Sequence, residues 1–157
     1  MDAAATFAAL FATLYVAHSV GDHWVQTSCQ ADEKGGAGWA GRWACTKHVI
    51  GLTATKGVLL VPVAVVLDLD LSVLGLLLGL GIDAVTHWWA DRRTTLARFA
   101  RVVGKSEFYS LGTPAHPVHP VTAEGTPAAH LGTGAYALDQ SWHHLWLLVA
   151  ALLIATV

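Results

Sequence analysis

The sequence is poor in charged residues and rich in apolar ones. Only 13% of its 157 residues are Asp, Glu, Lys or Arg, whereas 54% are hydrophobic, and the mean hydropathy is +0.50. Soluble domains carry about 25% charged residues, and their apolar residues are spread at amphipathic spacing, not collected into long runs. These proportions exclude an ordinary soluble domain and indicate that lipid surrounds most of the surface.

The sequence also lacks a concentrated basic region. The formal net charge is −2, and the basic residues lie beside hydrophobic runs without forming a patch of their own, which excludes nucleic acid as a partner. The chain begins Met1-Asp2, without the basic segment that opens a signal peptide. We therefore interpret the first hydrophobic run as a retained helix.

The hydrophobic runs predict an all-α, polytopic membrane protein: a bundle of about four transmembrane helices that forms one membrane domain over residues 1–157. A basic, amphipathic stretch after the third run predicts an interfacial helix lying on the membrane surface. Glycines, prolines and charges between the runs predict irregular loops. The predicted helices cover about 3–26, 46–67, 71–95 and 135–157, and the predicted loops cover 27–45 and 106–134.

The distribution of Lys and Arg predicts the orientation of this bundle. Cytoplasmic loops near membrane spans accumulate basic residues, and the short connection at 68–70 has none. Eight of the nine basic residues lie in or beside the two long loops: Lys34, Arg42, Lys47, Arg92, Arg93, Arg98, Arg101 and Lys105. We expect a multi-pass protein of the cell (inner) membrane with its N-terminus outside and both long loops in the cytoplasm. Cys29 and Cys45 would then be reduced, and only an inverted topology would favour a disulfide between them.

Histidines and aspartates recur at helical spacing near the cytoplasmic ends of the predicted helices. His18, Asp22 and Gln26 are spaced i, i+4, i+8, so they share one face of the first helix. Imidazole and carboxylate are the ligands that proteins use for zinc, iron or manganese, and facing helices of a bundle can supply them. The residues that converge on one end are His18, Asp22, Gln26, His48, Asp83, His87, Asp91, Asp139 and His143.

Six of these residues are candidate ligands of a divalent metal, with zinc as the expected ion and iron or manganese as alternatives. The candidate ligands are His18, Asp22, His48, His87, Asp91 and His143. They exceed the four that a tetrahedral zinc needs. Either two ions bind, or some carboxylates orient ligands or act in catalysis.

A simpler interpretation is that these polar residues hold the helices together by hydrogen bonds. Three i, i+4 pairs that converge with a fourth histidine favour a metal or proton-handling site over this alternative, because polar groups at membrane depth are unfavourable. His23 and His144 lie about 100° around their helices from the motif residues, so we interpret them as interfacial and as secondary candidates. The loop histidines His116, His119 and His130 are interpreted as solvated.

The motifs resemble those of a known family. His18 to Gln26 resembles a His-x-x-Gly-Asp-x-x-x-Gln signature, His87 to Asp91 resembles a His-x-x-x-Asp element, and Asp139 to His143 resembles an Asp-Gln-x-x-His element. Together with His48, they are similar to the domain of unknown function 3307 family of bacterial and phage membrane proteins. The resemblance covers nearly the whole chain except the loop at 106–134. It implies a polytopic membrane protein and names no reaction, and a looser resemblance links the chain to membrane-bound metal-dependent hydrolases.

The leading hypothesis is a metal-dependent hydrolase of a lipid or lipid-linked substrate at the cytoplasmic interface. Asp139 and Asp91 are its candidate catalytic carboxylates, one of them acting as base to a metal-bound water, and Gln26 and Gln140 are candidate substrate-binding residues. The alternatives are a small metal-ion or proton transporter or channel, for which Lys56 indicates a polar path, and a non-enzymatic membrane scaffold. Membrane lipid is the expected partner, and the chain can pair with a second copy to form a homo-oligomer.

Overall fold

The computed structural model describes residues 2–112 and 133–157, and the secondary structure within these ranges is helical throughout. This agrees with the predicted all-α class. The elements are α1 (Ala3–Val20), the π-helical segment η1 (Gly21–Val25), α2 (Ser28–Glu33), α3 (Gly38–Val66), α4 (Val73–Asp91), α5 (Thr94–Val102), α6 (Ser106–Ser110) and α7 (Gly134–Thr156).

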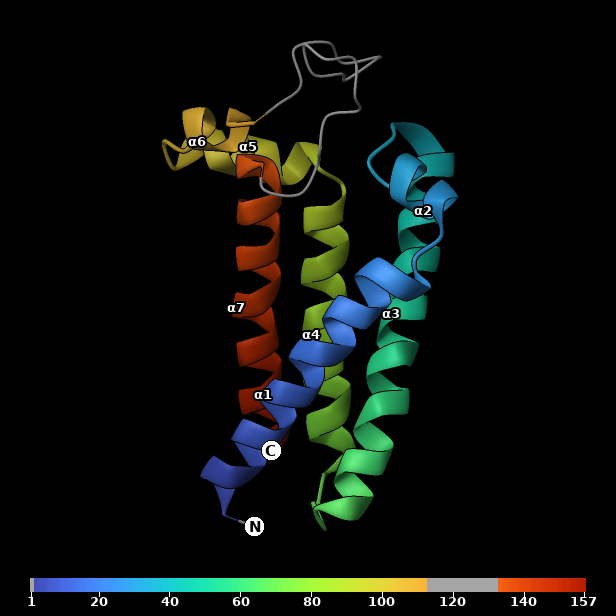
Figure 1. Cartoon of the computed structure of the whole chain (residues 1–157), viewed down its shortest axis with the longest axis vertical. Coiled ribbons are helices and arrows are strands. Elements are labelled where there is room, and N and C mark those ends of the chain that lie inside the picture. The colour runs from blue at the N-terminus through green and yellow to red at the C-terminus, as the bar shows by residue number, and fades with distance from the viewer. Residues whose placement is uncertain (1, 113–132) are drawn as a thin grey trace, which may run out of the picture.

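The long helices form a bundle with two distinct ends (Figure 1). Helices α3, α4 and α7 run alongside one another, and α1 crosses them obliquely while contacting α3 and α7. The two termini and the α3–α4 connection lie at one end. The short helices α2, α5 and α6 lie at the other end, so the segments that carry most of the basic residues share one side of the bundle.

Three segments of the described chain are long and apolar enough to cross a membrane: Ala3–Val25, Gly38–Val66 and Val73–Asp91. Their outward faces are apolar, with Val58 70% and Leu77 68% exposed. The fourth predicted span, α7, has 23 residues but carries polar residues through its first half, so it falls outside this group. That α7 also crosses the membrane stays a prediction.

The half of the bundle near the termini has a tightly packed apolar core. Leu10, Leu14 and Leu147 are fully buried there, and α4 packs closely on α7. A Cβ added to Gly79 of α4 would lie 2.5 Å from Ile154 Cγ1 and 2.7 Å from the Ala150 carbonyl oxygen. A glycine at this position therefore sets how closely the two helices approach.

The prediction of a loop over residues 27–45 is wrong, because helix α2 and the start of helix α3 occupy most of this range. Helix α2 begins with a capping box, in which the side chains of Thr27 and Gln30 each accept from the other's backbone N–H. Helix α3 begins at Gly38, earlier than the predicted start near residue 46. The glycines that indicated a loop instead permit a tight turn, since a Cβ on Gly41 would collide with the backbone of Gly36.

The third predicted helix, 71–95, also differs from the structure, because α4 ends at Asp91. Arg93 adopts a φ of 54°, a conformation that breaks a helix of L-residues, and α5 follows as a separate helix. Helix α5 buries Leu96 and exposes 84% of Val102, in keeping with the predicted amphipathic extension. Within the predicted loop at 106–134, α6 is an unexpected helix, and residues 113–132 lie outside the described residues.

Candidate metal centre

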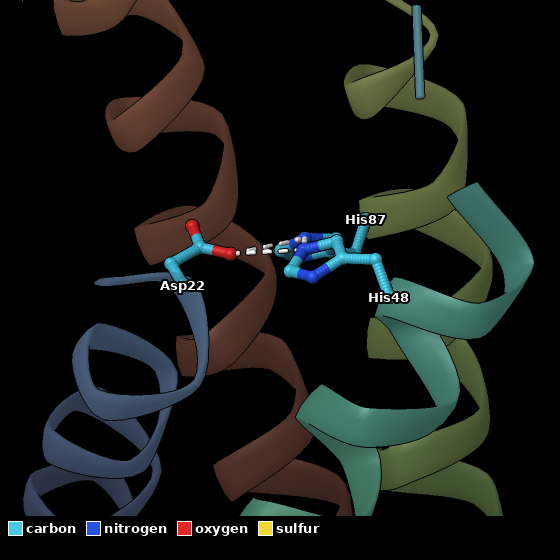
Figure 2. A group of neighbouring side chains, drawn as sticks. All are labelled: Asp22, His48 and His87. Carbon is cyan, nitrogen blue, oxygen red and sulfur yellow. Dashed lines mark hydrogen bonds and ion pairs between the residues drawn. The ribbon is translucent and has the colours of Figure 1, made fainter. Parts of the chain in front are cut away.

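Donor atoms of four side chains from three segments of the bundle point at one another. His48 Nε2 on α3 lies 3.1 Å from His87 Nε2 on α4 and 3.0 Å from Asp22 Oδ1 on η1. Asp91 Oδ2, one turn beyond His87, lies 3.2 Å from His48 Nε2 and 3.1 Å from His87 Nε2. Asp22 Oδ1 and His87 Nε2 are 3.6 Å apart. Figure 2 shows Asp22 reaching from one side of the bundle toward both imidazoles.

These side chains are almost completely removed from solvent. His48 is 2%, His87 1% and Asp91 3% exposed. A buried carboxylate or imidazole is unfavourable unless hydrogen bonds, opposite charges or a metal compensate for the lost water. The groups formed by Asp22, His48 and His87 and by His87, Asp91 and His143 could hold a metal ion.

The π-helical segment η1 and the glycine that opens it place Asp22 beside α3. The helix widens after α1, so that the backbone N–H of Gln26 donates to the Gly21 carbonyl oxygen at 3.0 Å. Such π-bulges are rare and concentrate at functional sites. A Cβ on Gly21 would collide with the Leu52 side chain of α3. Glycine at this position therefore allows the first helix to bring Asp22 within reach of His48.

Two further histidines and one aspartate lie next to this group. His18 Nε2 lies 3.4 Å from Asp22 Oδ2. His143 Nε2 on α7 lies 4.0 Å from Asp91 Oδ1 and 3.4 Å from Asp139 Oδ1. The structure therefore brings all six predicted metal ligands into one cluster, with the candidate catalytic residue Asp139 at its edge.

Several polar atoms of the cluster have no hydrogen-bond partner among the described residues. Polar atoms that are buried and also lack a hydrogen-bond partner are rare in native structures, and they call for an explanation such as an ion. In the cluster, these atoms are both ring nitrogens of His18, Asp22 Oδ1, His87 Nδ1, Asp91 Oδ2 and His143 Nε2; the short contacts that some of them make within the cluster, such as Asp22 Oδ1 to His48 Nε2 at 3.0 Å, do not have hydrogen-bond geometry. A bound cation would satisfy the nitrogen and oxygen acceptors among them.

A cavity of about 530 Å³ opens directly over the cluster. Burial, and then the Asp139 carboxylate, raise the pKa of the Tyr109 phenol above its usual value, so this lining residue remains a hydrogen-bond donor at neutral pH. The candidate substrate-binding residues Gln26 and Gln140 also line it. The polar lining residues are Asp22, His23, Gln26, Asp32, Lys34, Asp91, Arg93, Tyr109, Thr133, Tyr136, Asp139 and Gln140.

Lys34 belongs to this site, although no sequence pattern indicated it. Its Nζ lies 2.9 Å from Asp91 Oδ1, and two neighbouring arginines hold the backbone around it. Arg92 Nη1 donates to the Lys34 carbonyl oxygen at 2.6 Å, and Arg93 Nη2 donates to the Ala31 carbonyl oxygen at 2.6 Å. Arg92 and Arg93 therefore hold the backbone at Ala31 and Lys34 beside the cluster. The sequence had identified these two arginines only as cytoplasmic charge.

Asp83, which continues the spacing of His87 and Asp91, does not join the cluster. It forms a buried ion pair with Lys56 of α3, whose side chain is completely enclosed. This pair lies one helical turn from His87 on α4 and two turns from His48 on α3. The Lys56 side chain therefore faces the bundle interior.

The secondary histidine candidates lie outside the donor set. His23 Nδ1 is 2.8 Å from the Ser19 carbonyl oxygen, and the His144 ring packs against Tyr15 with centroids 4.7 Å apart. The loop histidines His116, His119 and His130 lie outside the described residues. Cys29 and Cys45 are both free thiols in this structure.

No family model, curated protein or solved structure matches this chain. The resemblance to the domain of unknown function 3307 family therefore stays a prediction. Chemically, the site combines imidazole nitrogens, carboxylates and a polar cavity. This combination suits a divalent cation that is bound on one side by the protein and accessible from the cavity on the other.

Proposed function

We propose that this chain is an integral membrane, metal-dependent hydrolase that acts on a lipid or lipid-linked ester or phosphoester. The observation that carries the proposal is the mutual spacing of His48 Nε2, His87 Nε2, Asp22 Oδ1 and Asp91 Oδ2. Five of the six separations among these atoms, all except that between the two carboxylate oxygens, run from 3.0 to 3.6 Å. Zinc bonds of about 2.0–2.1 Å place tetrahedral ligands about 3.3–3.4 Å apart. Zinc is accordingly the proposed ion, with iron or manganese as alternatives.

The exposed surface of the long helices supports a membrane location. Large apolar side chains cover the outward faces of α3 and α4, including Val61 at 64%, Val65 at 75% and Val85 at 66% exposure. Soluble monomers rarely expose continuous apolar surface of this extent. We propose the topology in which the termini lie outside and the end with α2, α5 and α6 faces the cytoplasm, because most of the basic residues lie there.

The position of the cavity supports a lipid or lipid-linked substrate. Its lining includes Arg93 and Leu96 at helix α5. Helix α5 lies across one end of the bundle (Figure 1) and has the amphipathic character of a helix at the membrane surface. A substrate there would keep its hydrophobic tail in lipid while its polar group enters the cavity. Gln26 and Gln140, both in the lining, would donate hydrogen bonds to its oxygen atoms.

Two carboxylates have distinct proposed roles in hydrolysis. Asp91 presents Oδ2 to both His48 and His87, so it would hold the ion. Asp139 is 27% exposed at the cavity and lies 3.4 Å from His143 Nε2, so it can accept a proton from an attacking water. The bound cation would supply the positive charge that lowers the pKa of that water.

Elemental analysis of the protein purified in detergent tests the metal site. We expect stoichiometric zinc, iron or manganese in the native protein and its loss from the His87→Ala variant, with unchanged far-UV circular dichroism. His23→Ala is the matched control and should retain the metal, since His23 bonds to its own helix. Equal metal content in the native and His87→Ala proteins, or no metal in the native protein, would exclude the site.

Hydrolysis of bis(p-nitrophenyl) phosphate, p-nitrophenyl butyrate and phospholipid vesicles tests the activity. We expect the metal-loaded protein to hydrolyse at least one of them, and Asp139→Asn to lose about 100- to 10,000-fold in rate while retaining metal, as for a general base. A metal-loaded protein without activity on any of the three would count against the hydrolase.

A second candidate, a metal-ion or proton transporter, is favoured by the Lys56–Asp83 pair, which extends the buried polar groups toward the middle of the bundle. Against it, Leu10, Leu14 and Leu147 form a packed apolar core in the other half. Cation or proton flux into proteoliposomes that is abolished by His87→Ala would support this candidate over the hydrolase.

A further inference from the structure

The two carboxylates of the proposed metal site each have a second oxygen that lies outside the four-donor set. Asp22 Oδ1 belongs to the set, whereas Asp22 Oδ2 lies 3.4 Å from His18 Nε2. Asp91 Oδ2 belongs to the set, whereas Asp91 Oδ1 lies 2.9 Å from Lys34 Nζ and 4.0 Å from His143 Nε2. A carboxylate whose two oxygens serve different partners can bridge two cations, as in the metal sites of helical bundles.

The two histidines on this second side are buried, and the Nε2 atom of each lacks a hydrogen bond to any described residue. His18 is 0% and His143 1% exposed, and Nε2 of each has no hydrogen-bond partner among the described residues. Their rings lie close together, with centroids 5.0 Å apart. A buried nitrogen without a hydrogen bond is unfavourable, and a cation bound beside these rings would remove that cost.

The surrounding charges show which carboxylates are free to hold a second ion. Lys34 occupies Asp91 Oδ1 with a contact of 2.9 Å, so Asp91 is committed to the first site and to Lys34. Within the described ranges, no Lys or Arg side chain forms an ion pair with Asp22 Oδ2. Asp139 Oδ1, at 3.4 Å from His143 Nε2, faces the same side and is open to the cavity, which gives a second ion an entry path and an exchangeable position.

We infer that the centre is dinuclear: a second divalent cation binds to His18, His143 and Asp22 Oδ2, Asp22 bridges it to the first ion, and Asp139 remains free as the base beside it. This inference rests on the proposed function, because the first ion is bound by His48, His87, Asp22 Oδ1 and Asp91. A single tetrahedral ion takes four ligands, so the remaining donors of the cluster are available to a second ion. Two cations that share a carboxylate in this way lie about 3.5–4 Å apart in hydrolytic enzymes.

Manganese is the probe for this arrangement, because two Mn²⁺ ions at such a separation are magnetically coupled. We would strip the detergent-purified protein with EDTA, titrate it with MnCl₂, and follow bound manganese by elemental analysis and electron paramagnetic resonance. We expect two equivalents per chain. The isolated six-line signal should disappear as the second equivalent binds.

A double variant, His18→Ala with His143→Ala, should bind one equivalent and keep the uncoupled six-line signal. His144→Ala is the matched control, since His144 neighbours His143 on α7 but packs against Tyr15. It should bind two equivalents with the coupled spectrum. His143→Gln provides a milder variant if the double substitution reduces folding, and it should also bind one equivalent.

The outcomes separate this inference from the proposed function. One equivalent in the native protein, or two uncoupled ones, would overturn the dinuclear centre and leave the single-metal hydrolase standing. Two equivalents retained in a folded double variant would equally overturn it. No manganese, zinc or iron bound by the native protein would overturn both proposals at once.

Discussion

The two halves of the helix bundle bury their interiors in different ways. In the half near the termini, Leu10, Leu14 and Leu147 form an apolar core, and Gly79 lets α4 press against α7. In the half near α5, the same helices face one another through histidines and aspartates, and several polar atoms of these side chains lack hydrogen-bond partners among the described residues. Packing alone therefore accounts for the first half, whereas the second contains buried atoms that a bound ion could satisfy.

The Lys56–Asp83 pair lies between these halves and makes the contrast clearer. It is as deeply buried as the His/Asp cluster, yet its two charges satisfy each other directly. Burial of polar groups is therefore not by itself a sign of a binding site in this protein. A binding site is indicated by the buried atoms of Asp22, Asp91 and His143 that lack hydrogen-bond partners among the described residues.

The largest loss of stability is expected when the satisfied pair is broken. Lys56→Ala leaves Asp83 buried without a partner, which should lower the free energy of unfolding by about 3–5 kcal/mol, measured by denaturant unfolding in detergent. The double variant Lys56→Met with Asp83→Leu removes both charges and should recover most of this loss. Metal content should be unchanged in the double variant. A single variant as stable as the native protein would contradict a structural role for the pair.

Removal of metal should destabilise the native protein, because the buried polar atoms of the His/Asp cluster would lose their partner. A free metal concentration 100 times the dissociation constant stabilises the folded state by about 2.7 kcal/mol, so EDTA should lower the unfolding free energy by about that amount. The same comparison with His87→Ala should show no difference, because this variant lacks an essential ligand. Equal sensitivity to EDTA in both proteins would place the metal elsewhere.

Gly79→Ala should weaken the apolar half without affecting metal. The added methyl group would meet Ile154 and the Ala150 backbone at 2.5 and 2.7 Å, and overpacking of this kind costs about 1–3 kcal/mol. Unfolding in detergent measures the loss, and elemental analysis checks that metal content is unchanged. Loss of metal in a folded Gly79→Ala protein would mean that the two halves are not independent.

The smallest effect is expected at Gly81, two residues further along α4. A Cβ there meets nothing within 4 Å, so Gly81→Ala should raise the unfolding free energy by about 0.4–1 kcal/mol by restricting the unfolded chain. The same unfolding assay compares it with Gly79→Ala. A loss as large as that of Gly79→Ala would indicate that a second copy of the chain packs on this face.

The helices and the cluster were both accessible to sequence reasoning, for different physical reasons. Long apolar runs identify α1, α3 and α4 because lipid imposes a minimum helix length. The i, i+4 spacing identified His18 with Asp22, His87 with Asp91 and Asp139 with His143, since helical periodicity places such pairs on one face. All three pairs lie within 4 Å in the structure.

Other features could not be read from local patterns. The glycines at 35–41 indicated a loop, but the close turn they permit depends on where α2 and α3 meet. Asp83 shares the spacing of His87 and Asp91, yet Lys56 captures it from another helix. Lys34 appeared only as a cytoplasmic charge, because nothing near it in sequence shows that Arg92 will anchor its backbone over Asp91.

The sequence by itself therefore determined the helical class, the membrane-length spans and the set of His and Asp residues available for a metal, because each follows from composition or from helical periodicity. The tertiary structure decided which donor atoms meet, which carboxylate oxygens face which histidines, and which charges neutralise one another. Those outcomes depend on the approach of separate helices, set by Gly21 against Leu52 and by Gly79 against Ile154. Contacts between segments far apart in the chain leave no periodic signal within any one of them.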